Sequence, residues 1–142
     1  MIVLDTNVNV GSELMKLAPA EAVARSIAER PASTLYTTSI TQAEILHGVM
    51  LLPSGKRRGA LEAAAEAMFA EDFDGRVLPF GSEAARAYAQ ISAQRRRAGR
   101  PISHFDAQIA AIARSARSSV ATRNAVDYED CGIQVLNPWG TL

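Results

Sequence analysis

The chain begins with the run Met1-Ile2-Val3-Leu4-Asp5-Thr6-Asn7. Its unbroken apolar start is typical of a strand buried on both faces, as in a parallel sheet covered by helices. The run ends in a carboxylate, and a charge at the end of a buried strand is costly unless it is paired, hydrogen-bonded or bound to a metal. Ligands of open α/β sheets gather at the carboxyl ends of the strands. The sequence therefore predicts that Asp5 lies in a functional site.

The size and composition are those of one ordinary globular domain spanning residues 1–142. Hydrophobic residues make up 48% of the chain and charged residues 21%, which suits a protein with a substantial core. No apolar run approaches the roughly 18 to 20 residues of a membrane span, and the buried strand leaves no room for a leader. The single cysteine, Cys131, has no partner for an internal disulfide. We therefore expect a cytoplasmic protein without membrane contact, in a reducing compartment.

The charges balance, with 15 Lys and Arg against 15 Asp and Glu. This balance argues against nucleic-acid binding driven by overall charge, although local basic patches are compatible with it. Two such clusters are present, Lys56-Arg57-Arg58 and Arg95-Arg96-Arg97 with Arg100. They are candidate phosphate contacts, and the alternative interpretation is a solvated helix face.

Predicted strands and helices alternate along the chain. Strands are expected at residues 1–4, 34–37, 76–80, 119–122 and 134–136, and helices at 12–17, 21–30, 40–50, 56–73, 82–98 and 105–117. Ser39 with Gln42 forms a capping box before the third of these helices, and Ser103 caps the last. Alternation of this kind predicts an α/β fold, a three-layer α/β/α sandwich with a mostly parallel sheet.

Four acidic residues interrupt otherwise apolar surroundings: Asp5, Glu44, Asp106 and Asp127. Carboxylates that converge at the strand ends would repel one another unless a divalent cation neutralised them. Oxygen ligands of this kind suit Mg²⁺ or Mn²⁺. Such an ion activates water and stabilises a phosphoryl transition state, which favours metal-dependent phosphodiester hydrolysis.

Each acid also has a purely structural interpretation. Asp106 follows Ser103 by three residues and could complete a capping box. Glu44 could be the exposed edge of an amphipathic helix, and Asp127 could bond to loop amides. From the residues alone, the prediction is a metal-dependent α/β enzyme.

Five segments carry a further signal through their order and spacing: residues 1–7, 38–48, 102–113 and 121–128, and the closing Asn137-Pro138-Trp139. Together they resemble the PIN-domain ribonucleases, in particular the VapC or FitB-like toxins of type II toxin–antitoxin pairs. One departure is the Val8–Gly11 segment, which is about two residues longer than the corresponding junction in relatives. The extra length bears on the antitoxin groove and, less strongly, on catalysis.

The resemblance implies roles for individual residues. Asp5, Glu44 and Asp106 match the acids that hold the metal, and either Asn124 or Asp127 fills the fourth position. We favour Asp127 as the carboxylate, with Asn124 as an outer partner. Thr6 would orient Asp5 or contact the scissile phosphate, and Asn7 completes the motif.

The resemblance further implies RNA cleavage, inhibition by a VapB/FitA-like antitoxin, contact with DNA only through that antitoxin, and homodimerisation. Arg95, Arg96, Arg97, Lys56 and Arg57 are the expected RNA contacts. The alternative function is a binding module that acts mainly in a DNA-binding toxin–antitoxin complex, with weak or no nuclease activity. A haloacid-dehalogenase-like phosphatase is excluded because position 7 is Asn, where that chemistry needs a second aspartate. A receiver domain is excluded because it needs an acidic pair ending the strand before the equivalent of Asp5.

Overall fold

The computed structural model describes residues 1–5 and 30–137, and five strands form its sheet in the order β3-β2-β1-β4-β5. The strands are β1 (Ile2–Leu4), β2 (Leu35–Thr38), β3 (Val77–Leu78), β4 (Ser119–Ala121) and β5 (Val135–Leu136). Every pairing is parallel. The N-terminal strand is therefore central, and the carboxyl ends of all five strands lie along one edge.

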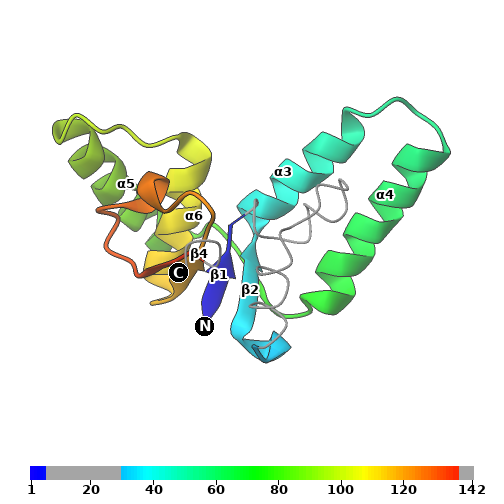
Figure 1. Cartoon of the computed structure of the whole chain (residues 1–142), viewed down its shortest axis with the longest axis horizontal. Coiled ribbons are helices and arrows are strands. Elements are labelled where there is room, and N and C mark those ends of the chain that lie inside the picture. Colours follow the sequence, from blue (N-terminus) through cyan, green and yellow to red (C-terminus); the bar gives the residue numbers. More distant parts are fainter. Residues whose placement is uncertain (6–29, 138–142) are drawn as a thin grey trace.

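Helices cover both faces of this sheet (Figure 1). The α-helices are α3 (Ser39–Met50), α4 (Lys56–Ala67), α5 (Ser82–Arg97) and α6 (His104–Ser115). Shorter helical segments are η1 (Ala32–Thr34), the π-helical η2 (Met68–Asp72) and the 3₁₀-helical η3 (Ala125–Tyr128). Figure 1 shows α5 and α6 on one side of the central strands and α3 and α4 on the other, which confirms the three-layer sandwich. No helix among the described residues is both long enough and apolar enough to cross a membrane.

Alternation along the strands divides the interior into two cores. Val3 and Val120 belong to the core formed with α5 and α6. Ile2, Leu4 and Ala121 belong to the core formed with α3, α4 and η2. Successive strand residues point to opposite faces, so the two-residue period carries Asp5, two positions after Val3, onto the α5/α6 side.

The apolar stretch in the middle of α6 forms the centre of the first core. Its buried residues are Ala107, Ile109, Ala110, Ala111, Ile112 and Ala113. Small alanine side chains allow α6 to approach both α5 and the sheet, and Ile91 of α5 is fully buried against it. Packing at this density fixes the helix, and with it the acid in its first turn.

The structure differs from the sequence expectations in several details. Thr38, not Ser39, caps α3, because the Thr38 hydroxyl accepts a hydrogen bond from the Thr41 amide. The buried face of α3 consists of Thr41, Ile45 and Val49, whereas Ala43 and Met50 are exposed. The helix predicted over 56–73 changes to π geometry at Met68. Ser103 caps α6 as predicted. The helix predicted at 12–17 and residues 21–29 of the helix predicted at 21–30 lie outside the described residues, as do Thr6, Asn7, Val8–Gly11 and Trp139.

Candidate active site

Asp5 lies where the apolar run predicted, at the carboxyl end of the central strand. Its amide donates to the Ala121 carbonyl at 3.0 Å, so the β1–β4 ladder continues as far as this residue. The side chain is only 4% exposed. One carboxylate oxygen, Oδ2, accepts a hydrogen bond of 2.8 Å from the hydroxyl of Thr122. A buried carboxylate needs such donors, because its desolvation is otherwise uncompensated.

Thr122 is fixed in orientation by two hydrogen bonds. Its hydroxyl donates to Asp5 and accepts from the Asn124 amide at 3.0 Å. The side chain has no exposed surface. Because a hydroxyl has one proton to donate, acceptance from Asn124 leaves that proton for Asp5. Thr122 therefore connects the end of β1 to the loop that follows β4.

Asp106 approaches the same place from the first turn of α6. Its amide donates to the capping hydroxyl of Ser103 at 3.2 Å, and a negative charge here is favoured by the helix dipole. The carboxylate oxygen Oδ1 accepts a hydrogen bond of 3.3 Å from the hydroxyl of Tyr128. The Asp106 side chain is half-buried. Its carboxylate is directed at η3, while its backbone N–H is bonded to the cap of α6.

Tyr128 joins the two acids. The side chain is 1% exposed. Burial raises the pKa of its hydroxyl above the ordinary value, and the charges and hydrogen bonds of Asp5 and Asp106 raise it further. The hydroxyl therefore stays a neutral donor and lies within the influence of both carboxylates. The structure brings Asp5 and Asp106 into one site, at the edge where ligands of α/β sheets bind.

Glu44 lies on the opposite layer, in α3. The side chain is half-buried. Residues four apart share one side of a helix, and Ile40, one turn earlier, packs against the core formed by α5 and α6. Glu44 is therefore on the side of α3 that turns toward α6.

Asp127 and Asn124 lie at the η3 turn. Successive side chains of a 3₁₀-helix are rotated by about 120° around its axis. The Tyr128 side chain faces the acid pair, so the half-buried side chain of Asp127 leaves the turn in a different direction. The backbone N–H of Asn124 donates to the hydroxyl of Thr122, which itself donates to Asp5. Its side chain is exposed.

The chemistry of the donors fits a hard divalent cation in part. Within the described residues, no three acidic, histidine or cysteine side chains are grouped closely enough to form a metal site. Of the four predicted carboxylates, the hydrogen bonds and charges around Tyr128 relate two to each other, those of Asp5 and Asp106. Two carboxylates that reach one hydroxyl in a water-poor site repel each other, and oxygen ligands of this type are those that Mg²⁺ and Mn²⁺ prefer.

Comparison with known proteins identifies the family. The sequence profile of the PIN domain matches residues 2–128. The chain belongs to the PIN-domain family. It is 42% identical over 139 residues to the VapC ribonuclease Y4jK of Sinorhizobium fredii, covering 98% of each chain. It is 37% identical to toxin FitB of Neisseria gonorrhoeae, covering 98% of this chain and 99% of FitB.

Solved structures agree with this assignment. The crystal structure of FitAcB from Neisseria gonorrhoeae has a TM-score of 0.89 and 36% identity, and the match covers 99% of each chain. The structure of FitAB bound to an IR36 DNA fragment also has a TM-score of 0.89, at 35% identity, covering 100% of this chain and 98% of that one. The resemblance to VapC and FitB seen in the sequence is confirmed, as is the PIN fold.

The basic residues of this PIN domain fall into two groups. Arg96, Arg97, Lys56 and Arg57 are exposed, as an RNA contact requires. Arg95 is only 5% exposed, and its guanidinium donates to backbone carbonyls inside the protein. The prediction that Arg95 contacts RNA is therefore wrong, because its helical position places it on the buried side of α5.

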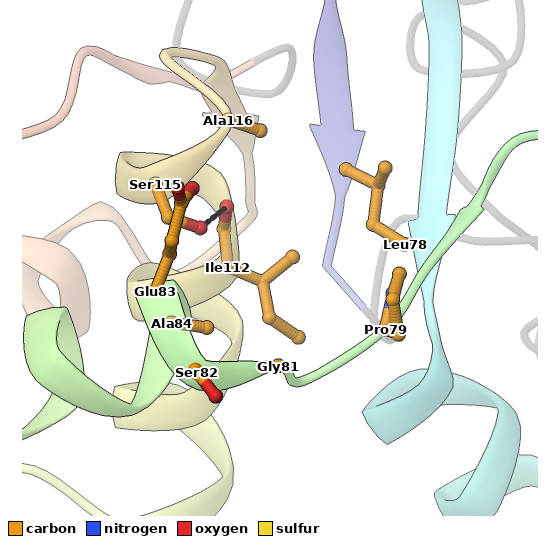
Figure 2. Close-up of a pocket in the computed structure, with 9 residues that line it drawn as sticks. All are labelled: Leu78, Pro79, Gly81, Ser82, Glu83, Ala84, Ile112, Ser115 and Ala116. Atoms are coloured by element: carbon orange, nitrogen blue, oxygen red, sulfur yellow. Dashed lines mark hydrogen bonds between the residues drawn. The ribbon is translucent and has the colours of Figure 1, made fainter.

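A hollow of about 330 Å³ lies away from the acids, at the junction of β3, α5 and α6. Figure 2 shows Leu78 and Pro79 on one side and Ile112 and Ser115 of α6 on the other. The lining residues of α6 come from its last turns, whereas Asp106 is in its first turn. Neither Asp5 nor Asp106 lines this hollow, so it is separate from the candidate active site of the PIN domain.

Two residues of the site were not singled out from the sequence, Thr122 and Tyr128. Thr122 follows β4, and the end of β4 lies beside the end of β1. The argument that selected Asp5 applies equally to a polar residue ending a neighbouring parallel strand. Tyr128 carries no comparable signal, because only the tertiary structure brings its hydroxyl to Asp5 and Asp106.

Proposed function

We propose that this PIN domain is the toxin of a type II toxin–antitoxin pair and a metal-dependent endoribonuclease that hydrolyses RNA phosphodiester bonds. The observation that carries the proposal is the buried Asp5, joined through Tyr128 to Asp106 at the carboxyl edge of the sheet. Its support is the match, over almost the whole chain, to relatives named VapC ribonuclease and toxin FitB. RNA and an antitoxin as partners imply action in the cytoplasm.

Asp5 and Asp106 would hold the divalent cation, Mg²⁺ or Mn²⁺, with Glu44 as the third carboxylate from α3. Asp127 and Asn124 are the candidates for the fourth position: Asp127 offers a carboxylate, and the backbone N–H of Asn124 donates to Thr122, which in turn donates to Asp5. When bound, the ion supplies Lewis acidity and a water activated for attack. Thr122 orients Asp5 and Tyr128 donates to Asp106, and the amino end of α6 favours the negative charge of Asp106.

The proposed contacts to RNA phosphates are the exposed basic residues Arg96, Arg97, Lys56 and Arg57. Replacing Arg96 and Arg97 together by Gln should weaken RNA binding and reduce its salt dependence. Equal binding and an equal salt slope would remove these two residues from the interface. Thr6 and Asn7, which follow Asp5 in the sequence, keep their proposed supporting role.

The partners follow from the same relatives. FitAB is described as bound to a DNA fragment, and we propose that this chain likewise pairs with a VapB/FitA-like antitoxin, meets DNA only through that antitoxin and forms a homodimer. The second candidate function is a binding module that acts mainly in this complex and has weak or no nuclease activity. The DNA-bound FitAB structure favours DNA binding through the complex as a role in addition to RNA cleavage.

Expression in a bacterial host tests the proposal. The wild type should arrest growth, and Asp106→Asn should relieve the arrest at equal protein level, because it removes a charge that holds the ion. Glu66→Gln, at an exposed position on α4, is the matched control and should arrest growth like the wild type. Equal toxicity of Asp106→Asn and wild type would reject catalysis by this site. Purified wild type that cleaves no RNA with Mg²⁺ or Mn²⁺, but binds the antitoxin, would support the second candidate instead.

A further inference from the structure

Arg95 is a buried charge inside the PIN domain. It is 5% exposed and lies in the last turn of α5. Its guanidinium donates to the carbonyl of Arg100 at 2.7 Å, the carbonyl of Asp127 at 3.0 Å, the carbonyl of Glu129 at 2.9 Å and the sulfur of Cys131 at 3.7 Å. None of these partners in the described part of the chain is a carboxylate.

A guanidinium in this position is costly unless it is hydrogen-bonded, because removing an ion from water costs several kcal/mol. Among the described residues, the carbonyls of Arg100, Asp127 and Glu129 supply these bonds. Such charge-assisted bonds offset the cost of burial. The planar fork of Arg reaches several acceptors at fixed angles, which the point charge of Lys cannot reproduce. The site is therefore built for Arg rather than for any cation.

The acceptors show what Arg95 holds in place. Asp127 and Glu129 are the residues directly before and after Tyr128, and one nitrogen of Arg95 binds both carbonyls. The η3 turn is four residues long, and a 3₁₀ turn of that length is weakly held by its own hydrogen bonds. Arg95 therefore fastens the backbone on both sides of the tyrosine that reaches Asp5 and Asp106.

A second arginine, Arg100, forms ion pairs with the same segment at the protein surface. Arg100 pairs with Glu129 at 2.5 Å and with Asp130 at 2.8 Å. These groups are 41% to 62% exposed, so solvent screens the pairs and their contribution is small. The buried contacts of Arg95 are the stronger restraint.

We propose that Arg95 is a positioning residue of the active site: by holding the carbonyls on either side of Tyr128, it keeps the tyrosine hydroxyl at the Asp5–Asp106 pair. This inference rests on the proposed function, because it assigns a role toward the same metal-holding acids. Arg95 touches neither acid and acts through the η3 backbone.

The first test is Mn²⁺ binding by the full chain, measured calorimetrically for wild type, Arg95→Lys and Arg95→Met. Loss of a partner that orients metal ligands typically weakens metal affinity 10- to 100-fold, so we expect a loss of about tenfold or more in both variants. Arg86→Met is the matched control, since Arg86 is exposed on the same helix; it should bind Mn²⁺ like the wild type. Circular dichroism selects conditions under which each variant is folded, and Arg95→Lys decides the matter if Arg95→Met does not fold.

Hydrogen exchange tests whether the effect is local. In Arg95→Lys, amides of residues 125–131 should exchange faster while those of α3 keep their wild-type rates. Exchange that accelerates equally in every helix would indicate general destabilisation and overturn the proposal. Wild-type exchange in 125–131 would overturn it as well.

A double-mutant cycle tests the route through Tyr128. Tyr128→Phe removes only the hydroxyl and should weaken Mn²⁺ binding without changing exchange in 125–131. If Arg95 acts through this hydroxyl, Arg95→Lys should add little to Tyr128→Phe, because coupled residues are non-additive. Fully additive losses, or unchanged Mn²⁺ affinity in the folded Arg95 variants, would contradict the proposal.

RNA cleavage separates this inference from the proposed function. A positioning role lowers kcat in Arg95→Lys by about tenfold with little change in KM. Wild type that binds Mn²⁺ but cleaves no RNA would count against the proposed nuclease, and the binding cycle would still decide the role of Arg95. Wild type that does not bind Mn²⁺ would count against both.

Discussion

The helices α3 and α6 each carry a proposed metal ligand shortly after a capped start, yet they are packed to different degrees. Six residues of α6 are buried, whereas α3 buries only Thr41, Ile45 and Val49. The side chains of Asp106 and Glu44 are both half-buried, and the Asp106 carboxylate accepts a hydrogen bond from Tyr128. The acid proposed from α6 is thus carried by a deeply buried helix, and the acid proposed from α3 by a less buried one.

This difference teaches that the same local sequence pattern, a cap followed by an acid, does not decide how deeply the helix that carries the acid is buried. The surrounding tertiary contacts decide it. On the α6 side, Thr122 donates a hydrogen bond to Asp5. Arg95 donates to the backbone carbonyls on both sides of Tyr128. Both acids of that side are consequently preorganised, which is what a metal-assisted reaction requires.

The largest expected effect comes from exchanging the two acids for their amides. Asp106→Asn should lower RNA cleavage by more than about 100-fold, because removing a ligand should exceed the loss from removing a residue that only supports one. Glu44→Gln should lower it as well, but less, because its helix is less fixed. Initial cleavage rates at saturating Mg²⁺ measure both. A larger loss for Glu44→Gln would reverse the comparison between the layers.

The packing of the two helices is compared by truncating one apolar side chain in each. Ile109 of α6 is 1% exposed, so Ile109→Ala should cost about 2 to 5 kcal/mol of unfolding free energy. Leu46 of α3 is half-buried, and Leu46→Ala should cost about 1 kcal/mol. Urea denaturation monitored by circular dichroism gives both values. Equal losses would mean that the α3 layer is as tightly packed as the α6 layer.

The preorganisation of Asp5 is tested by Thr122→Val, which keeps the shape of the side chain and removes the hydroxyl. Asp5 then loses a donor in a buried site, and the free energy of unfolding in metal-free buffer should fall by about 1 to 3 kcal/mol. The control is Thr34→Val, because the Thr34 hydroxyl bonds a carbonyl at an exposed place; it should change stability by no more than about 0.5 kcal/mol. Equal, small effects would show that Asp5 does not depend on Thr122.

The smallest effects concern the two caps. Thr38→Ala and Ser103→Ala should each cost about 1 kcal/mol, because each leaves a first-turn amide without its acceptor. Thr38 is fully buried and its hydroxyl also bonds the Thr41 hydroxyl at 3.3 Å, so its loss should be the greater. Thermal unfolding of the two variants provides the measurement. A greater loss for Ser103→Ala would contradict this order.

The sequence predicted the sheet, the layers and the position of Asp5, because these follow from hydrophobic runs and alternation. It did not distinguish Thr38 from Ser39 as the cap of α3, since adjacent hydroxyl residues carry the same signal. The buried position of Arg95 was available in principle. The buried stripe of α5 is Ala84, Ala87, Ile91 and Arg95, and continuing its spacing of three and four residues reaches Arg95 but not Arg96 or Arg97.

The contact of Tyr128 with the acids could not be predicted in this way. Asp106 and Tyr128 are 22 residues apart, and no local pattern relates a 3₁₀ turn to the first turn of another helix. The proposed roles of Glu44 and Asn124 likewise depend on the relative placement of segments rather than on local sequence. The sequence therefore predicts which acids are candidates, and only the tertiary structure shows which of them lie close together.

The most direct test of the central claim is anomalous diffraction from crystals of the wild-type chain grown with Mn²⁺. The account predicts one or more anomalous peaks between the carboxylates of Asp5 and Asp106, at coordination distances of about 2.0 to 2.2 Å. A well-ordered site without such a peak, in crystals that bind Mn²⁺ elsewhere on the surface, would contradict it.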